Sequence, residues 1–147
     1  MNYKKGLIDE LPELVKTNFQ IFSGMYEWPP YTLDQYTERL NGVNPTIFIA
    51  ERDDKIIGDS IAFEKDGGWY LWILGVLEEY RKQGVATQLL DLNEQYAREN
   101  SYKEITVKVY NVSKEMLKLL IGRGYEIVDI HKDKNSKYNG IVLRLIL

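Results

Sequence analysis

The segment RKQGVAT, residues 81–87, lies between an apolar stretch and a pattern typical of a helix. A helix that begins at Gly84 directs its first backbone N–H groups and the positive end of its dipole toward the strand before it. Such a helix start binds anions, and Gly84 would let a bulky anion approach the main chain. Arg81 and Lys82 add positive charge. Because a lone glycine before a helix is more often a simple turn, this segment alone is compatible with a turn or a phosphate site.

The composition excludes several kinds of site. The chain lacks both the GxxxxGK[ST] and the GxGxxG phosphate motifs. It has no cysteine, which excludes disulfides, a thiolate nucleophile and a cysteine-based zinc site. Its single histidine, His131, excludes a cluster of histidine ligands, so we expect no metal. A net charge of −3 argues against general binding to nucleic acid or to an anionic membrane.

The length of 147 residues predicts one domain over residues 1–147, large enough to bury a core. The N-terminal stretch MNYKKGLIDELPELVK lacks the apolar run of a signal peptide. No stretch approaches the roughly 20 apolar residues that a membrane helix needs. We therefore expect a cytoplasmic protein.

Two helices are predicted in the first part of the chain. Residues 11–22 carry apolar side chains at helical spacing, with Asp9 as a plausible N-cap. Thr32 and Gln35 form a capping-box pattern for a second helix that ends near Leu40. The joint between these helices contains two prolines and is rich in aromatic residues.

From residue 46 the apolar period changes to two, which is typical of strands. Segments 46–52, 56–65 and 69–76 are separated by short turns and predict an antiparallel meander. The third strand is apolar on both faces, as a central strand covered on both sides requires. Gly75 within it indicates a bulge or the close approach of another group.

The second half of the chain alternates helices and strands. We expect a helix from Gly84 to about Asn100, a strand at 104–111, a helix capped by Ser113, and a hairpin from 125–130 and 139–147. The element order predicts an α+β fold: a mixed, mostly antiparallel sheet with helices on both faces. A helical crossover joins its third and fourth predicted strands, and Gly124 suits a left-handed position after the last helix.

Residues 74–90, LGVLEEYRKQGVATQLL, resemble the acyl-CoA-binding segment of the GNAT N-acyltransferase superfamily, whose signature is R/Q-x-x-G-x-G/A. Residues 107–128 resemble the family's next strand, its asparagine, its helix and its terminal Gly-Phe/Tyr pair. The matching residues are Arg81, Gly84 and Ala86 in the first segment, and Asn111, Gly124 and Tyr125 in the second. The predicted element order is also similar to that family's along nearly the full chain.

The resemblance implies transfer of an acetyl group from acetyl-CoA to a primary amine of a small molecule or a protein. Without a cysteine, direct attack in a ternary complex is favoured over an acyl-enzyme on cysteine. Backbone N–H groups of residues 74–76 could stabilise the oxyanion if Gly75 marks a bulge. The implied acetyl-CoA site consists of Leu74, Gly75, Val76, Arg81, Lys82, Gln83, Gly84, Val85, Ala86, Thr87 and Asn111.

The reaction needs a proton acceptor, because an alkyl amine with a pKa of about 10 is only about 0.1% neutral at pH 7. Glu64 and Tyr70 are the catalytic candidates, and Glu27 is a further possible base. The chain departs from the family at two positions. A tyrosine that serves as acid in many members is Lys118 here, and a glutamate base of some members is Thr106.

Four residues of the joint are candidates for the acceptor site, although aromatic residues beside prolines are as often simple packing. They are Tyr26, Glu27, Trp28 and Tyr31. Two other functions stay open: a non-catalytic acyl-CoA-binding module, and a small α+β interaction domain with no such ligand. The apolar C-terminal stretch IVLRLIL suggests edge pairing in a homodimer.

Overall fold

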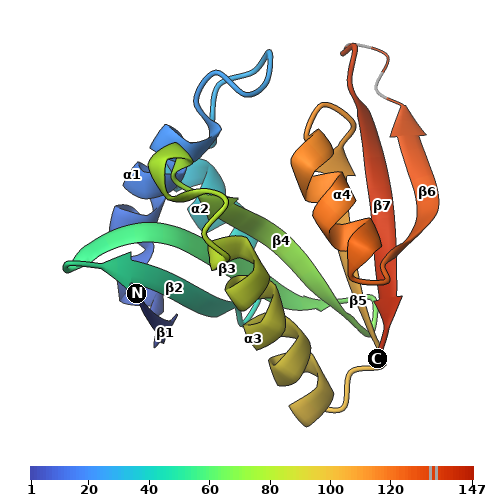
Figure 1. The fold of residues 1–147 in the computed structure, drawn as a ribbon, viewed down its shortest axis with the longest axis horizontal. Helices are drawn as coiled ribbons and strands as arrows, with labels where there is room; N and C mark the ends of the chain where they lie inside the picture. The colour runs from blue at the N-terminus through green and yellow to red at the C-terminus, as the bar shows by residue number, and fades with distance from the viewer. Residues whose placement is uncertain (133, 135) are drawn as a thin grey trace.

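The structure, a computed structural model, describes residues 1–132, 134 and 136–147. Two short 3-10 helices, η1 (Ile8–Glu10) and η2 (Glu78–Tyr80), accompany the longer elements. These are, in chain order (Figure 1), β1 (Asn2–Gly6), α1 (Leu11–Phe22), α2 (Leu33–Leu40), β2 (Thr46–Arg52), β3 (Lys55–Lys65), β4 (Gly68–Val76), α3 (Val85–Glu99), β5 (Glu104–Tyr110), α4 (Lys114–Gly122), β6 (Glu126–Lys132) and β7 (Asn139–Ile146).

The strands form a single sheet in the order β1-β2-β3-β4-β5-β7-β6. The β4–β5 pair is parallel, and the other neighbouring pairs are antiparallel. The predicted mixed, mostly antiparallel sheet is thus confirmed, as is the meander of β2, β3 and β4. Strand β1 was not predicted, because its sequence NYKKG shows no apolar alternation and it forms by pairing with β2.

Helices cover both faces of the sheet, as predicted. On one face, α1 and α2 pack on the meander around Leu14, Tyr36 and Ile61. On the other face, α3 and α4 pack on β4, β5 and β7, where Leu90, Leu120 and other apolar side chains are buried. The amphipathic spacing of each helix therefore places its apolar side against the sheet.

A bulge does lie in β4, but not at Gly75. The register between β3 and β4 shifts after Ile61, which leaves Trp72 as the extra residue, whereas Gly75 pairs regularly with Asp59. The alternative prediction for Gly75, a close approach, is confirmed. A Cβ atom there would lie 2.8 Å from Ile21 Cγ2 and 3.0 Å from Phe22 Cζ. Gly75 thus lets the end of α1 contact the sheet.

The helix ends test the predicted caps. Thr32 and Gln35 form the expected capping box, with Gln35 N donating to Thr32 Oγ1 at 3.3 Å. Gly124 is left-handed, as predicted, with φ of 96°. The Asp9 cap is wrong, because Asp9 belongs to η1 and Glu10 precedes α1. Ser113 does occupy the N-cap position of α4, but its side chain accepts no capping hydrogen bond from the helix.

The C-terminal strand β7 lies inside the sheet between β5 and β6. The prediction that IVLRLIL pairs as an edge is therefore wrong, because β7 uses both of its sides within its own chain. The open edges of the sheet belong to β1 and β6. Among the described residues, none of the helices has both the length and the apolar character needed to cross a bilayer.

Candidate active site

Strands β4 and β5 open like a V. They pair only where Trp69–Leu71 faces Ile105–Val107. Beyond this point they diverge toward their carboxyl ends (Figure 1), and the rest of β4 pairs only with β3. The Trp72 bulge lies directly after the last β4–β5 pair, where it bends the strand. The opening therefore exposes backbone groups of a central strand.

The exposed β4 donors can be identified from the ladder. Leu77 N donates to Ile57 O of β3 at 2.8 Å. Because backbone groups alternate sides along a strand, Leu74 and Val76 direct their N–H groups away from β3, into the opening. The carbonyl of Val76 accepts a hydrogen bond from Arg81 Nε at 3.0 Å. Among the described strands, none pairs with this side of Leu74 and Val76, because β5 diverges from β4 after Leu71. A bulge at Gly75 is not the cause, since Gly75 pairs regularly with Asp59.

Helix α3 begins at the mouth of this opening. Its N-cap residue, Gly84, is left-handed with φ of 82° and provides no side-chain cap. Apart from its chain neighbours, no described heavy atom lies within 4 Å of where a Cβ of Gly84 would be. The first N–H groups of α3, from Val85 to Thr87, therefore keep their capacity to bind an anion. The side chain of Val85 is buried and fixes this end of the helix on the core.

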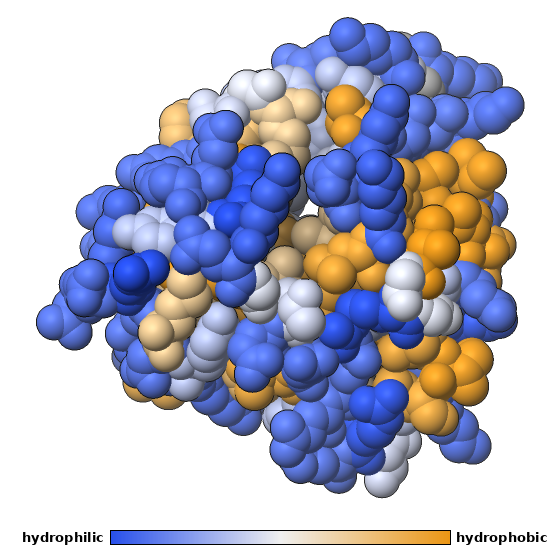
Figure 2. Space-filling model, in the orientation of Figure 1, coloured by the Kyte–Doolittle hydropathy of each residue, from blue (hydrophilic) through white to orange (hydrophobic). Residues whose placement is uncertain are grey.

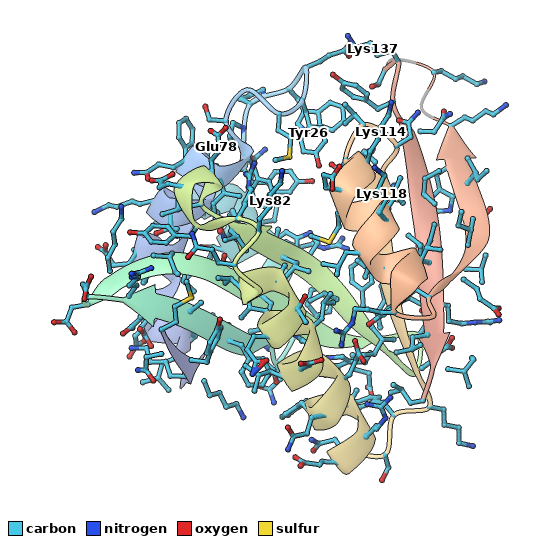
Figure 3. The ribbon with its side chains drawn as sticks, in the orientation of Figure 1. Tyr26, Glu78, Lys82, Lys114, Lys118 and Lys137 are labelled. Atoms are coloured by element: carbon cyan, nitrogen blue, oxygen red, sulfur yellow. The ribbon has the colours of Figure 1, made fainter. Side chains whose placement is uncertain are left out.

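Positive charge borders the opening on both sides. Lys82 lies beside the start of α3, and Lys114 and Lys118 lie on α4 across from it (Figure 3). The surface is hollowed between these two elements (Figure 2). Lys118 is exposed and pairs with Glu115 at 3.6 Å. Arg81, by contrast, uses its Nε atom on the Val76 carbonyl, so that it stabilises the turn. Gln83 does the same by donating to Glu79 O.

Asn111 lies at the end of β5, where it fastens the neighbouring strand. Its backbone N donates to Asn139 O at 2.9 Å, and its Oδ1 accepts from Asn139 N at 3.0 Å. The side-chain oxygen of Asn111 is therefore occupied by β7. Its role in cofactor binding stays a prediction.

The joint between α1 and α2 contacts the far half of the sheet. Tyr26 and Trp28 stack with their ring centroids 5.2 Å apart. Tyr110 of β5 and Tyr138 both contact this pair edge-on. The hydroxyl groups of Tyr26 and Ser113 share a hydrogen bond of 3.0 Å. Through these contacts the joint spans the opening between β4 and β5 and reaches the end of β5 and the start of α4.

The remaining two joint residues, Glu27 and Tyr31, contact different parts of the structure. Glu27 is exposed and pairs with Lys137 at 3.5 Å. Tyr31 lies apart, stacked on the bulge residue Trp72 at 6.0 Å and edge-on to Tyr36. The structure thus brings Tyr26, Glu27 and Trp28 together beside the end of β5 and places Tyr31 on the α2 face of β4.

The two catalytic candidates lie away from the opening. Glu64 is exposed and pairs with Trp69, at the opposite end of β4 from Gly75. With about 3.3 Å per residue, this distance along the strand is roughly 20 Å. Tyr70 packs against Phe63 at 5.6 Å, and burial raises its pKa, so it stays protonated at neutral pH. These placements do not support either residue as the base.

Sequence reasoning missed a buried carboxyl beside the opening. Asp59 pairs with Gly75 and is fully buried, and burial raises its pKa to about 7. Its Oδ2 accepts from Asn18 Nδ2 at 3.0 Å, which opposes this shift in part. Its Oδ1 has no partner among the residues that the structure describes. The signal in the sequence was an aspartate at the centre of the apolar run IIGDSIAF.

The described part of the chain contains no group of three or more His, Cys, Asp or Glu side chains that could hold a metal ion. His131 is exposed on β6 and pairs with Asp129 at 3.0 Å. What the opening offers is instead a set of backbone donors and a positive rim. Such a set suits a phosphate-bearing ligand.

A family model described as the acetyltransferase (GNAT) family matches residues 8–125. No curated protein sequence matches this chain.

Among solved structures, the ribosomal-protein-S18-alanine N-acetyltransferase of Escherichia coli is similar, with a TM-score of 0.83 at 13% identity over 99% of this chain and 92% of that one. The PaiA N-acetyltransferase of Thermoplasma acidophilum, in complex with coenzyme A, has a TM-score of 0.77 at 13% identity over 100% of both chains. A putative streptothricin acetyltransferase of Bacillus anthracis, in complex with acetyl coenzyme A, has a TM-score of 0.67 at 24% identity over 76% of this chain and 68% of that one. These similarities establish the fold.

Proposed function

Because this chain belongs to the GNAT acetyltransferase family, we propose that it transfers an acetyl group from acetyl-CoA to a primary amine of a small molecule or a protein. One observation carries the proposal: the uncapped start of α3 opens at the mouth of the β4–β5 V, beside free N–H groups of β4. The same short stretch of chain thus offers donors to a pyrophosphate and to a carbonyl group.

The residues present fit acetyl-CoA. Backbone N–H groups from Val85 to Thr87 would hold the pyrophosphate, and the open space over Gly84 lets it approach. Lys82 and Lys118 would add charge from the two sides of the opening. In this assignment Arg81 shapes the turn, since it already donates to the Val76 carbonyl.

Acetyl-CoA supplies an activated thioester, whose carbonyl carbon accepts the amine nitrogen. The N–H groups of Leu74 and Val76 are the donors that the protein directs into the opening, and they would stabilise negative charge on the carbonyl oxygen. In the overall transfer a C–N bond forms, the C–S bond breaks, the amine loses a proton and the thiolate leaves.

The amine would enter from the side that the α1–α2 joint covers. On that side Glu27 is an exposed carboxylate beside Tyr26 and Trp28, and we assign it to attract the ammonium group and accept its proton. The hydroxyl of Tyr26 is not a base at neutral pH, because burial raises its pKa. It can donate, and it contacts the start of α4 through Ser113.

The direct test is thermal unfolding with and without acetyl-CoA. A ligand at about 100 times its dissociation constant stabilises a protein by roughly 2.7 kcal/mol, which raises the melting temperature by several degrees at this size. Replacement of Ala86 by Asp places a negative charge at the cradle and should remove this shift. The matched control, Gln95→Asp, adds the same charge to an exposed position of the same helix and should keep it.

Absence of a shift with wild-type protein at millimolar acetyl-CoA would overturn the proposal. Thiol release in the presence of a panel of amines then separates an enzyme from a binding module. Acceptor-dependent release supports the transferase, whereas binding without release supports the non-catalytic module that Thr106 and Lys118 would suggest. A cytoplasmic location and a single domain over residues 1–147 stay predictions.

A further inference from the structure

Half-buried aromatic rings form one surface at the side of the opening where the α1–α2 joint lies. They belong to Tyr26 and Trp28 of the joint, to Tyr110 at the end of β5, and to Tyr138. Val109 packs on the α4 side of the sheet, and side chains alternate along a strand, so Tyr110 faces the side of α1 and α2. The rings therefore lie where the amine of the proposed reaction would enter.

Lys108 is held beside this surface by a glycine of the neighbouring strand. Its Nζ atom lies 5.6 Å from the centre of the Tyr110 ring. Tyr110 pairs with Gly140 of β7. A Cβ atom at Gly140 would overlap the Cε atom of Lys108. The absence of a side chain at Gly140 thus leaves the space in which Lys108 lies.

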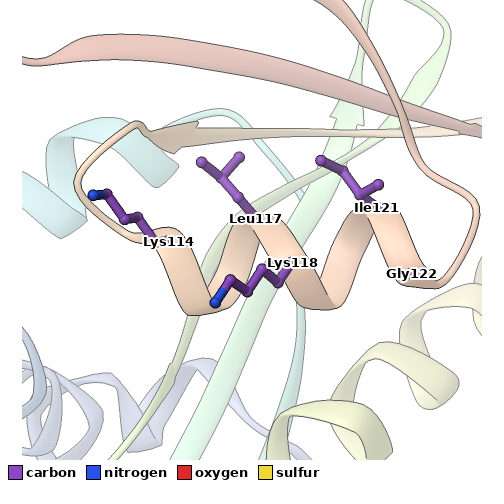
Figure 4. Close-up of a pocket in the computed structure, with 5 residues that line it drawn as sticks. All are labelled: Lys114, Leu117, Lys118, Ile121 and Gly122. Carbon is purple, nitrogen blue, oxygen red and sulfur yellow. The ribbon is translucent and has the colours of Figure 1, made fainter.

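Two further lysines border the rings from other elements. Lys114 begins α4, directly after Ser113, whose hydroxyl shares a hydrogen bond with that of Tyr26 (Figures 3 and 4). Lys137 places its Nζ atom 5.5 Å from the centre of the Tyr138 ring. We call the four rings together with Lys108, Lys114 and Lys137 the basic–aromatic surface.

This surface carries an excess of positive charge. Lys137 pairs with Glu27 at 3.5 Å. Lys108 and Lys114 are exposed, and neither has an ion-pair partner among the residues that the structure describes. Three lysines and one glutamate give a local charge of +2, in a chain whose net charge is −3. Such a local excess attracts a partner of opposite charge.

The arrangement of the charges indicates the chemistry of this partner. Glu27 is the one carboxylate on the basic–aromatic surface, and it suits a single ammonium group. The other charges are ammonium groups, which suit carboxylates. An amino group that is followed by several carboxylates matches this arrangement. Nucleic acid would bring phosphates with no amine to acetylate, and the net charge of −3 disfavours it further.

The spread of the lysines indicates an extended ligand. The three lysines come from β5, from α4 and from the link between β6 and β7, and each lies beside a different ring. A ligand that contacts all of them must reach over several rings. A peptide in an extended conformation suits this surface, because its residues follow one another about every 3.3 Å.

We propose that the basic–aromatic surface binds the acceptor, and that this acceptor is an acidic peptide segment whose amino group is followed by Asp or Glu side chains. Its carboxylates would pair with Lys108 and Lys114. Its ammonium group would replace Lys137 at Glu27. The inference rests on the proposed function and adds the class of acceptor.

Thiol release with two matched peptides tests the preference. Both have a free amino terminus and an amidated carboxyl end, and they carry either aspartates or asparagines after the first residue. With saturating acetyl-CoA at low salt, kcat/KM should be roughly tenfold or more higher for the aspartate peptide. The ratio of the two values should fall as salt is added, because salt screens exposed charges.

Three variants locate the preference. Lys108→Glu should lower the ratio of the two kcat/KM values roughly tenfold, because it replaces an attractive charge by a repulsive one. Gly140→Ala keeps every charge but displaces Lys108, and it should lower the ratio several-fold. The control Lys103→Glu makes the same charge change at an exposed lysine just before β5, at the other end of this strand from Tyr110, and should keep the ratio. Far-UV circular dichroism checks that each variant folds.

The thermal shift with acetyl-CoA separates this inference from the proposed function. A normal shift together with equal release from the two peptides, including none from either, would overturn the inference and leave the cofactor site standing. Absence of the shift would overturn both. A ratio that Lys103→Glu lowers as much as Lys108→Glu does would also overturn the inference, because the charge effect would then be general. In fluorescence anisotropy with labelled aspartate peptide, displacement by oligothymidylate at lower concentration than by unlabelled peptide would assign the surface to nucleic acid instead.

Discussion

Replacement of Asp59 by Asn should make the stability of the protein less dependent on pH. The carboxyl is fully buried, and its pKa of about 7 in the folded state lies well above the ordinary value of 3.8. The folded state therefore binds the proton more tightly than the unfolded state does. The contribution of Asp59 to stability is full below about pH 4, falls as the pH rises toward 7, and stays lost above 7.

The size of this effect follows from the shift. One pKa unit corresponds to 1.36 kcal/mol, so a shift of about three units is worth up to about 4 kcal/mol above pH 7. Part of this stabilisation is already lost at pH 5, because in the unfolded chain the carboxyl of residue 59 is ionised above its ordinary pKa of 3.8. Between pH 5 and pH 8, the stability of the Asn variant relative to wild type should rise by about 2–3 kcal/mol. The introduced amide can still accept a hydrogen bond from Asn18 Nδ2.

Urea unfolding at pH 5 and pH 8 measures this difference, and at this chain length it corresponds to roughly 5–10 °C in melting temperature. Asp9→Asn, a change at an exposed aspartate, serves as the control and should show no such dependence. The reasoning would be refuted if the difference between wild type and the Asp59 variant were the same at both pH values. It would then follow that Asp59 does not take up a proton on folding.

Three further changes test other parts of the structure. Gly75→Ala places a Cβ 2.8 Å from Ile21 and should cost about 1–3 kcal/mol of unfolding free energy, measured in urea; an unchanged midpoint would contradict the close approach. Arg123→Ala removes the ion-pair partner of Glu94, 2.8 Å away, and should lower the free energy of unfolding in urea by about 1–3 kcal/mol. Its control, Lys16→Ala, breaks an exposed ion pair and should lower the free energy of unfolding by well under 1 kcal/mol. Glu27→Gln should lower acceptor-dependent thiol release at least tenfold while keeping the thermal shift with acetyl-CoA; equal loss of both would contradict its assignment.

Much of the fold could be predicted because its signals are local. Helical spacing in residues 11–22 and alternation in residues 46–76 each depend on neighbours in the chain, and the structure confirms both. The Thr32–Gln35 capping box is likewise a local interaction. Strand β1 was missed because the residues of β2 that pair with it lie 41 to 49 positions later in the chain, from Gly6↔Ile47 to Asn2↔Glu51, and because its own sequence carries no pattern.

The candidate site divides in the same way. The segment around Gly84 could be recognised from sequence, since its conformation and its free N–H groups follow from a glycine directly before a helix. Glu64 of β3 and Tyr70 of β4 lie near the turn that joins these two strands. Their distance from the site could not be predicted, because only the structure shows that β5 diverges from β4 beyond Leu71, toward the other end of β4.

The sequence by itself determined the element order, the helix start at Gly84 and the absence of cysteine chemistry, because composition and spacing are properties of the chain alone. Only the tertiary structure decided that β5 diverges from β4, that Tyr26 and Trp28 contact Tyr110, and that Asp59 is buried beneath α1. It also decided that β6, and not β7, forms an edge of the sheet. These features depend on contacts between residues far apart in the chain, and the energy of such contacts is set by burial and packing that no short segment contains.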